Sequence, residues 1–356
     1  MIPHSRPTLG TEEKEALLAV LDSGQIAQGE RVIEFEKAFC ELTGRRYAIA
    51  VSSGTSALYL ALLALEVSGG DEVILPSYTC AALLHAIDAV GALPVLVDID
   101  LSDFNLAVHE VKKKIRRKTR AVIVPHAFGR AARMEELADL VVPLIEDGTQ
   151  ALGARVGRKM VGGVGELSVF SFYATKMITT GEGGMVLTNS LRLAERLHDL
   201  RDYDRKETHR FRTNSKMTDL EAAMGFVQMK KLSGFVARRR ELASRYREAL
   251  KNLEVILPQE EKARDHVYYR FVIRVPKGKK EFMSALIARG IEVKEPVFKP
   301  LHQYLDLADS KFPFTIQAVK ESCSLPLYPS LSDEACDRIS EAIREMRPTP
   351  DHVEVS

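Results

Sequence analysis

Short apolar runs that alternate with helical segments are the feature that most constrains the fold of this chain. Each run is a near-continuous series of Val, Ile, Leu and Ala, at residues 47–51, 72–75, 93–97, 120–124, 141–145 and 184–188. Such runs are typical of strands that are buried on both faces of a parallel sheet. The segments between them have helical periodicity, at residues 57–65, 81–90, 107–118 and 134–140. We therefore predict an α/β domain with a mainly parallel sheet covered by helices.

The second half of the chain follows a different pattern. Residues 218–250 predict one long helix, with apolar residues on one side and many Arg and Lys on the other, and residues 267–275 alternate like a strand with one wet face. Further helices are predicted at residues 11–22, 31–43, 279–289 and 332–346. Because the length of the chain favours two domains, we predict a large domain over residues 1–235 and a smaller α+β domain over residues 236–356.

The charge composition argues against nucleic acid or an anionic membrane as a partner. The chain has 356 residues, with 50 Lys and Arg against 49 Asp and Glu, so no net field attracts a polyanion. The basic run at 112–118 stands alone and is interpreted as a solvated helix face. The four cysteines show no metal-binding spacing. With no apolar leader and no apolar run of membrane length, we expect a cytoplasmic protein without a metal site.

Lys176 is the strongest candidate for a catalytic residue. It lies just before the glycine-rich segment 180–185, which can hold a lysine still while its amine stays reachable for a carbonyl carbon. An acidic pair, Glu146 and Asp147, ends an earlier apolar run. A carboxylate there can keep the nitrogen of a pyridine ring protonated, because an opposite charge favours the charged form. Gln150 can form a hydrogen bond with a phenolic oxygen on the same ring. A Schiff-base lysine with an acidic partner indicates pyridoxal phosphate.

The segment 52–56 lies between a predicted strand and a predicted helix. Backbone N–H groups at a helix N-terminus bind phosphate, Gly54 allows close approach of the backbone, and Ser53 and Thr55 add hydroxyl groups. An ordinary serine or threonine helix cap also explains this segment. Neither a GxxxxGK[ST] loop nor a GxGxxG fingerprint occurs here, which argues against a nicotinamide-dependent dehydrogenase.

Seven motifs occur in the order typical of one family, at residues 53–58, 70–79, 94–100, 146–154, 170–176, 181–184 and 324–329. Over nearly the whole chain the sequence resembles the DegT/DnrJ/EryC1/StrS family, which comprises nucleotide-sugar aminotransferases of pyridoxal-phosphate fold type I. The resemblance implies a large domain with a mainly parallel seven-stranded sheet and a smaller α+β C-terminal domain.

The resemblance also implies a role for each matching residue. Lys176 matches the lysine that forms the Schiff base with pyridoxal phosphate. Asp147, rather than Glu146, matches the carboxylate at the pyridine nitrogen, and Gln150 matches the residue beside the ring oxygen. The residues that match phosphate contacts are Gly54, Thr55 and Ser171.

Four further residues are compared here with the residues that the family carries at the same positions. Asn214 resembles the asparagine of a loop that reaches the cofactor phosphate of the neighbouring subunit, which implies a homodimer. His302 resembles a histidine near the sugar site, and a surface histidine explains it equally well. Cys80 matches a cofactor-binding position of the family. Many family members carry there an aromatic ring that stacks on the pyridine. A thiol has no π-face, so we expect lower cofactor affinity or another residue over the ring. His126 is interpreted as a buried histidine without a catalytic role.

The family's chemistry implies a ping-pong transfer of an amino group from an amino acid, glutamate by resemblance, to a nucleotide-linked keto sugar. Lys176 would move the proton as a general base. Relatives that dehydrate sugars carry histidine in place of this lysine, so transamination is favoured. Two alternatives stay open, namely a fold type I enzyme acting on another substrate and a cofactor-binding regulatory protein with little turnover. The sequence does not identify the sugar.

Overall fold

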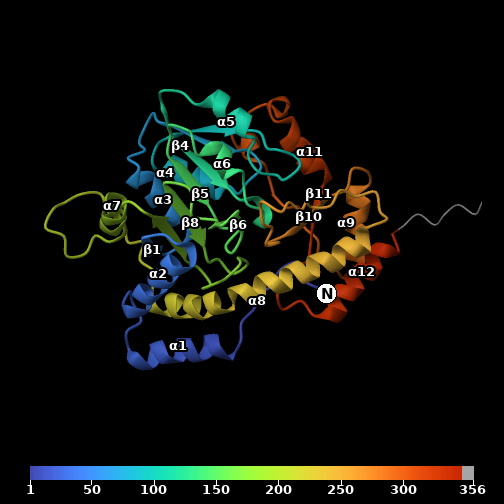
Figure 1. Cartoon of the computed structure of the whole chain (residues 1–356), viewed down its shortest axis with the longest axis horizontal. Helices are drawn as coiled ribbons and strands as arrows, with labels where there is room; N and C mark the ends of the chain where they lie inside the picture. The colour runs from blue at the N-terminus through green and yellow to red at the C-terminus, as the bar shows by residue number, and fades with distance from the viewer. Residues whose placement is uncertain (347–356) are drawn as a thin grey trace, which may run out of the picture.

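A sheet forms the centre of the molecule (Figure 1). It has seven strands in the order β1-β9-β8-β5-β4-β2-β3. The computed structural model describes residues 1–346. Its strands are β1 (Tyr47–Val51), β2 (Glu72–Pro76), β3 (Leu93–Val97), β4 (Thr119–Pro125), β5 (Leu144–Asp147), β8 (Leu167–Ser171) and β9 (Gly184–Thr188). β9 runs antiparallel to both of its neighbours, β1 and β8, and the other strand pairs of this sheet are parallel. The prediction of a mainly parallel seven-stranded sheet is confirmed.

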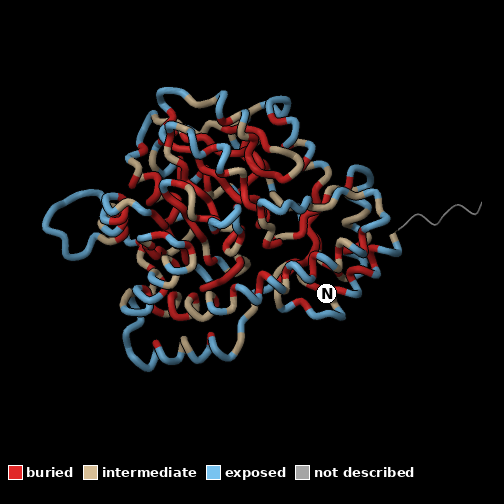
Figure 2. Tube along the Cα trace, viewed as in Figure 1, coloured by how far each residue is buried: buried red, intermediate tan, exposed pale blue. Residues whose placement is uncertain are grey.

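Helices cover both faces of the sheet, and the strands are therefore apolar on both sides. In β1, Ile49 and Val51 pack into one core cluster, whereas Ala48 and Ala50 pack into another on the opposite face. This is the two-residue alternation of a strand with no face in water. The helices of the large sheet are α3 (Gly54–Ala64), α4 (Ala82–Ala89), α5 (Val108–Lys114), α6 (Met134–Leu137) and α7 (Leu191–Arg201). Figure 2 shows the buried residues concentrated in this layered centre.

The long helix α8 (Asp219–Leu250) packs on α1 (Thr11–Ser23) and α2 (Glu30–Thr43) at one end and on α12 (Asp333–Arg344) at the other (Figure 1). It begins with a capping box in which Thr218 accepts the N–H of Glu221, and the Glu221 carboxylate accepts the N–H of Thr218. The predicted domain boundary after residue 235 falls inside this helix, and that boundary stays a prediction.

The C-terminal part surrounds a small two-stranded sheet with a core cluster of its own. Strands β10 (Phe271–Arg274) and β11 (Ser322–Leu325) pair antiparallel. Most of the buried residues in this cluster come from residues 242–343, and Ile2 joins them from the N-terminus. The remaining elements are β6 (Arg155–Val156), β7 (Lys159–Met160), α9 (Lys279–Ala288), α10 (Leu301–Tyr304) and α11 (Pro313–Glu321), with two 3₁₀ turns at Ala127–Gly129 and Asp309–Lys311.

Two predicted strands are displaced or shortened in the structure. The run at 141–145 was predicted as a strand, but β5 begins only at Leu144, and Val141 is 94% exposed before it. The predicted strand at 267–275 is limited to β10, because Tyr268 has a left-handed backbone with φ of 50° and a strand cannot continue through it. Sequence periodicity also missed α7, α11, β8 and β11.

No helix within residues 1–346 combines the length and the apolarity that crossing a membrane would require.

Candidate active site

An inner cavity of about 310 Å³ lies at the carboxyl ends of β5 and β8 and beside the start of α3. Ligands of open α/β sheets bind at this edge, because the loops that follow parallel strands meet there. The structure brings most of the predicted site residues together in its wall: Gly54, Thr55, Cys80, Asp147, Gln150, Ser171 and Lys176. Residues that are far apart in the sequence thus face one small volume.

The first turn of α3 makes one end of the inner cavity suitable for an anion. Ser53 caps the helix, since its Oγ accepts the backbone N–H of Ser56 at 3.0 Å, so the ordinary helix cap is present as well. The remaining N–H groups of the first turn and the helix dipole favour a negative group. Gly54 lets the start of α3 approach the end of β8 closely, because a Cβ at residue 54 would lie 2.6 Å from the Cβ of Ser171. A phosphate fits this end of the cavity.

The two acids at the end of β5 point to opposite sides of the sheet. Glu146 is held by the backbone N–H groups of Gly162, Val164 and Gly165 at 2.7, 3.0 and 3.0 Å and by His126 at 3.1 Å. Burial opposes ionisation of Glu146, but these hydrogen bonds outweigh it and lower its pKa to about 2. Asp147 lines the inner cavity instead.

His126 is buried and bonded on both ring nitrogens, as the sequence led us to expect. Its Nδ1 accepts the N–H of Ala132 at 2.8 Å, so its Nε2 carries the proton that faces Glu146. This histidine therefore helps to hold Glu146 in its loop and does not contribute to the inner cavity.

Gln150 has its amide orientation set by the backbone. Its Oε1 accepts the N–H of Phe128 at 2.8 Å, and the side chain lines the inner cavity. Because the oxygen is engaged, the NH₂ group is the part left to act as a donor. A ligand oxygen, rather than a ligand N–H, fits beside Gln150.

An outer cavity of about 320 Å³ adjoins the inner one, and Thr79, Cys80, Gln150 and Lys176 line both. The outer cavity lies between the large sheet and the C-terminal part of the chain. Lys176 therefore stands at the junction of the two cavities, where its amine can meet a group bound in either.

Tyr269 is the nearest notable neighbour of this lysine. The Nζ of Lys176 lies 5.4 Å from the centroid of the Tyr269 ring, and the Tyr269 hydroxyl lies 3.4 Å from Oγ1 of Thr175. Burial raises the pKa of Tyr269, but the charges of Lys176 and Arg270 and the bond with Thr175 outweigh burial and lower it to about 8.

Sequence reasoning missed the residues that the C-terminal part adds to the outer cavity, notably Tyr269, Arg270, Phe298, Lys299 and Tyr304. Tyr269 and Arg270 were assigned to the predicted strand 267–275. The sequence has no glycine at Tyr268 to indicate that the backbone becomes left-handed there. Phe298 and Lys299 follow Pro296 in a segment without periodicity. The adjacent aromatic residues Tyr268 and Tyr269, before β10, were the one sequence signal for these cavity residues.

Two predicted site residues lie outside both cavities. His302 is fully buried, with its Nδ1 2.6 Å from the Ser77 hydroxyl and its Nε2 2.9 Å from Asp309, and it stacks on Phe312. It is therefore not a surface histidine, and the structure does not bring it to the outer cavity. Asn214 is exposed and pairs with Asp202 at the base of the loop that follows α7.

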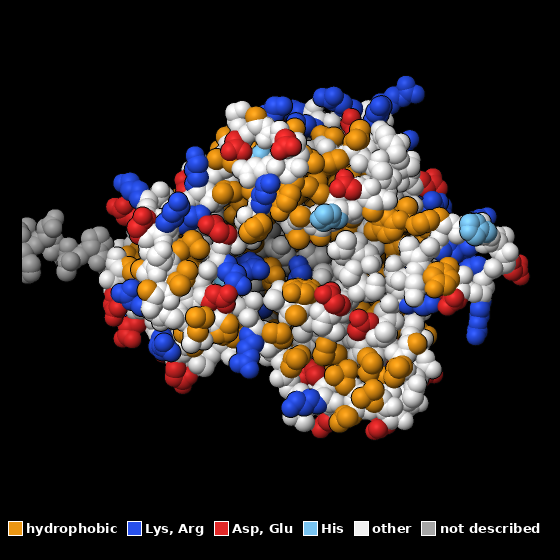
Figure 3. All heavy atoms as spheres, turned by 180° about the vertical axis from the view of Figure 1, so that it is seen from behind, with side chains coloured by type: hydrophobic (Ala, Val, Ile, Leu, Met, Phe, Trp, Pro, Cys, Tyr) orange, Lys and Arg blue, Asp and Glu red, His pale blue; other side chains and the backbone are white. Residues whose placement is uncertain are grey.

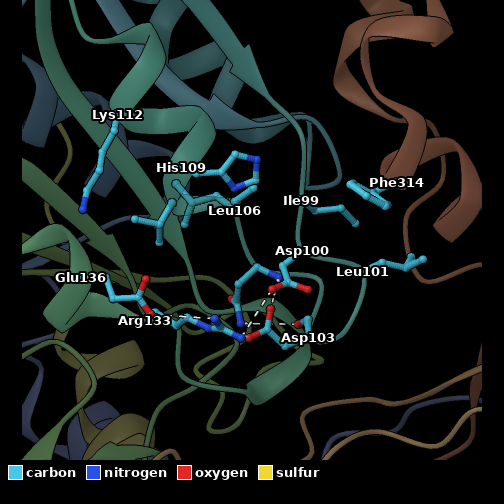
Figure 4. Close-up of a pocket in the computed structure, with 13 residues that line it drawn as sticks. Ile99, Asp100, Leu101, Asp103, Leu106, His109, Lys112, Arg133, Glu136 and Phe314 are labelled. Carbon is cyan, nitrogen blue, oxygen red and sulfur yellow. Dashed lines mark hydrogen bonds and ion pairs between the residues drawn. The ribbon is translucent and has the colours of Figure 1, made fainter.

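A larger cavity of about 430 Å³ lies between the β3–α5 connection and α11 (Figure 4). Four of its charged side chains pair with one another, since Arg133 lies 3.4 Å from Asp100 and 3.8 Å from both Asp103 and Glu136. The predicted site residues do not line it. Cavity size alone therefore does not locate the site.

A model of the DegT/DnrJ/EryC1/StrS aminotransferase family matches residues 7–344. The chain belongs to this family. The resemblance drawn from the motifs is thereby confirmed, and the protein is an aminotransferase that depends on pyridoxal phosphate.

Named relatives match over nearly their whole length. GDP-perosamine synthase of Escherichia coli O157:H7 is 36% identical over 97% of this chain and 98% of its own. The spore coat polysaccharide biosynthesis protein SpsC of Bacillus subtilis is 31% identical over 97% of each chain. Among solved structures, DesV of S. venezuelae, in complex with a ketimine intermediate, has a TM-score of 0.90 at 33% identity over 95% of each chain.

The residues present fit pyridoxal phosphate. The first turn of α3, which lines the inner cavity, suits the phosphate group. Lys176 provides an amine at the junction of the cavities, and Asp147 provides a carboxylate in the same wall. The NH₂ group of Gln150 suits the phenolic oxygen. Tyr173 is the one aromatic residue among the described residues that line the inner cavity. It is therefore the candidate to supply the aromatic ring that is missing at Cys80.

Proposed function

We propose that this aminotransferase moves an amino group from an amino acid, in the first instance glutamate, to a keto sugar carried on a nucleotide. The two half-reactions would share one site and give ping-pong kinetics. The observation that carries the proposal is the junction of the two cavities at Lys176, with the inner cavity on one side for the cofactor and the outer cavity on the other for substrates.

The composition of the outer cavity supports an anionic substrate. Its wall includes Lys176, Arg270 and Lys299 and contains no Asp or Glu. Phe298 is 93% exposed at this cavity, and an exposed aromatic ring is a platform on which a nucleobase can stack. The relative named GDP-perosamine synthase makes a nucleotide-linked sugar by its name, which points to the same class of acceptor for this chain.

Pyridoxal phosphate supplies a carbonyl for Schiff-base exchange and a ring that withdraws electrons from the carbon that loses its proton. The chain provides the groups around it. Asp147 would keep the pyridine nitrogen protonated, since the opposite charge favours the protonated form. Gln150 would donate to the phenolic oxygen, and Gly54, Thr55 and Ser171 would hold the phosphate.

Lys176 would have two tasks. Its amine would hold the cofactor at rest and, once displaced by an amino donor, would carry the proton between donor and cofactor as a general base.

The direct test is an absorbance spectrum of the protein with pyridoxal phosphate, before and after addition of glutamate. The visible band of the bound cofactor is expected to bleach in the wild type and to persist in Lys176→Ala. Lys14→Ala, which removes an exposed lysine of α1, serves as the matched control and should bleach like the wild type.

Nucleotide-linked keto sugars would then be screened for their ability to restore the band. Restoration by such a sugar establishes the acceptor class. A wild-type protein that bleaches with no amino donor would refute the proposed reaction, and restoration by small keto acids alone would assign the enzyme to another substrate.

A further inference from the structure

Arg270 is a cation in the wall of the outer cavity without a carboxylate partner in the described part of the chain. Its recorded contacts are to His4 and to the ring of Tyr269. Two buried arginines of this protein behave differently: Arg264 is paired with Asp103 at 2.7 Å and Arg201 with Glu36 at 2.7 Å. A guanidinium placed in a cavity whose wall contains no acid is suited to an anion supplied by a ligand.

His4 holds this guanidinium in place. Nη1 of Arg270 lies 3.1 Å from Nδ1 and 3.2 Å from Nε2 of His4, and the second nitrogen also lies 2.9 Å from the Ser324 hydroxyl. A guanidinium only donates hydrogen bonds, and a neutral imidazole has one unprotonated nitrogen, so at most one of these two contacts is a hydrogen bond to His4. Burial, and then the charge of Arg270, lower the pKa of His4 to about 3, and the ring therefore stays neutral.

The N-terminal segment is itself anchored to the C-terminal part. The backbone N–H of His4 donates to the Glu292 carboxylate at 2.8 Å, and Ile2 bridges to Ile291. The Tyr269 ring lies on another side of the guanidinium, with its centroid 5.2 Å from Cζ of Arg270. Two rigid neighbours thus fix Arg270 without neutralising it, so that little conformational freedom remains to be lost when an anion binds.

We propose that Arg270, positioned by His4, is the anion-binding residue of the outer cavity and that it binds the carboxylate or phosphate groups of the substrates. This inference rests on the proposed function, because it assigns substrates to the outer cavity. A planar guanidinium matches both groups with two parallel hydrogen bonds. In a ping-pong enzyme both substrates occupy this cavity in turn, and one cation can serve each.

The test measures anion binding to the cofactor-loaded enzyme by calorimetry, with the cofactor already occupying the inner cavity. Succinate represents the dicarboxylate donor, and inorganic pyrophosphate represents the diphosphate of the acceptor. Arg270→Gln is expected to weaken binding roughly 10- to 150-fold, the worth of hydrogen bonds to a charged group. Arg270→Lys should recover only part of this, since it keeps the charge and loses the fork.

The pattern across the two anions identifies the ligand group. Weakening for succinate alone assigns Arg270 to the donor, weakening for pyrophosphate alone assigns it to the acceptor, and weakening for both assigns it to a shared anion site. Unchanged binding of both anions overturns the inference. Lys277→Gln removes an exposed positive charge outside the cavity and should bind both anions as the wild type does.

His4 is tested by rescue. His4→Leu removes the acceptor and should weaken anion binding although Arg270 is present, whereas His4→Gln keeps an acceptor and should restore most of it. Equal binding in both His4 variants and the wild type would refute the positioning role. The Arg270 variants decide the anion site even if His4→Leu does not fold.

The two proposals fail separately. If glutamate bleaches the cofactor band but Arg270→Gln binds both anions normally, the anion assignment is wrong and the aminotransferase proposal stands. If no amino donor bleaches the band, the proposed reaction is wrong, and calorimetry still reports whether Arg270 binds anions.

Discussion

Glu146 and Asp147 are neighbours in the sequence with different surroundings in the structure. Glu146 is enclosed by backbone N–H groups and His126, whereas Asp147 faces the inner cavity. The cause is the alternation of side chains along a strand, which sends successive residues to opposite faces. An acidic pair at the end of a strand can therefore divide structural and catalytic work between its members.

This division predicts opposite phenotypes for two isosteric changes. Asp147→Asn should leave folding intact and lower kcat roughly 10- to 1000-fold, in line with the loss of a charge that shifts a neighbouring pKa by 1–3 units. Glu146→Gln should instead destabilise the protein by about 1–3 kcal/mol, since it leaves buried N–H donors without their carboxylate acceptor. Steady-state kinetics and thermal unfolding of both variants are the measurements, and a reversed pattern would show that the roles are exchanged.

The stability that Glu146 provides should depend on pH. Its pKa in the folded protein is about 2, below the usual 4.5, so its contribution is complete above about pH 4.5 and is lost as the pH falls toward 2. The difference in unfolding free energy between wild type and Glu146→Gln should therefore shrink in acid.

Tyr269 is expected to ionise early. Its pKa of about 8 lies below the usual 10.0, because Lys176 and Arg270 attract the phenolate more strongly than burial opposes it. As the pH rises from 8 to 10, the folded protein ionises before the unfolded one and gains stability. Absorbance near 295 nm (tyrosinate) in the cofactor-free protein should show one transition near pH 8 that is missing in Tyr269→Phe. A first transition near pH 10 in the wild type would contradict this.

At the scale of elements, the site depends on the close approach of α3 to the end of β8. Gly54→Ala would place a Cβ against Ser171 and should cost about 1–3 kcal/mol of stability, the usual penalty for overpacking, while lowering cofactor affinity. The double variant Gly54→Ala/Ser171→Gly should regain stability, because it removes the clashing atoms, but it should not regain affinity, because the hydroxyl is lost. Thermal unfolding and cofactor titration measure the two effects, and an unchanged Gly54→Ala would contradict the role of this contact.

Element boundaries show where periodicity failed. The predicted strand 141–145 included residues that lie before β5, because an apolar residue such as Val141 can remain in water in a loop. The apolar run of β8 went unrecognised, although it lies directly before the segment containing Lys176. Motif spacing still located the lysine, since its role depends on chemistry rather than on the strand boundary.

At the scale of the whole molecule, the loop that follows α7 extends away from the body of the protein and carries several basic side chains (Figures 1 and 3). Asn214 lies at its base and outside both cavities of its own chain. We propose that Asn214 completes the cofactor site of a neighbouring subunit in a homodimer. The family resemblance implies that Asn214 binds the cofactor. Because Asn214 lies outside the cavities of its own chain, it can do so in the neighbouring subunit.

Complementation between two inactive variants tests this proposal. Lys176→Ala and Asn214→Ala would be made separately and then co-expressed. Random pairing makes about half of the dimers mixed, each with one intact site, so about a quarter of the wild-type activity should return. If both residues served the same chain's site, every site in the mixture would lack one of them and no activity would return.

The sequence alone determined the α/β class, the family and the cofactor, because these depend on local patterns and on the order of motifs. It also singled out Lys176, Asp147 and Gln150, whose roles stay predictions. The tertiary structure decided what no local pattern contains. It separated Glu146 from Asp147 and placed His302 in the interior. It also brought Arg270 from the C-terminal part into the wall of the outer cavity, and His4 from the N-terminus into contact with Arg270. These relations arise from contacts between segments up to 266 residues apart, and such contacts leave no periodicity in the chain.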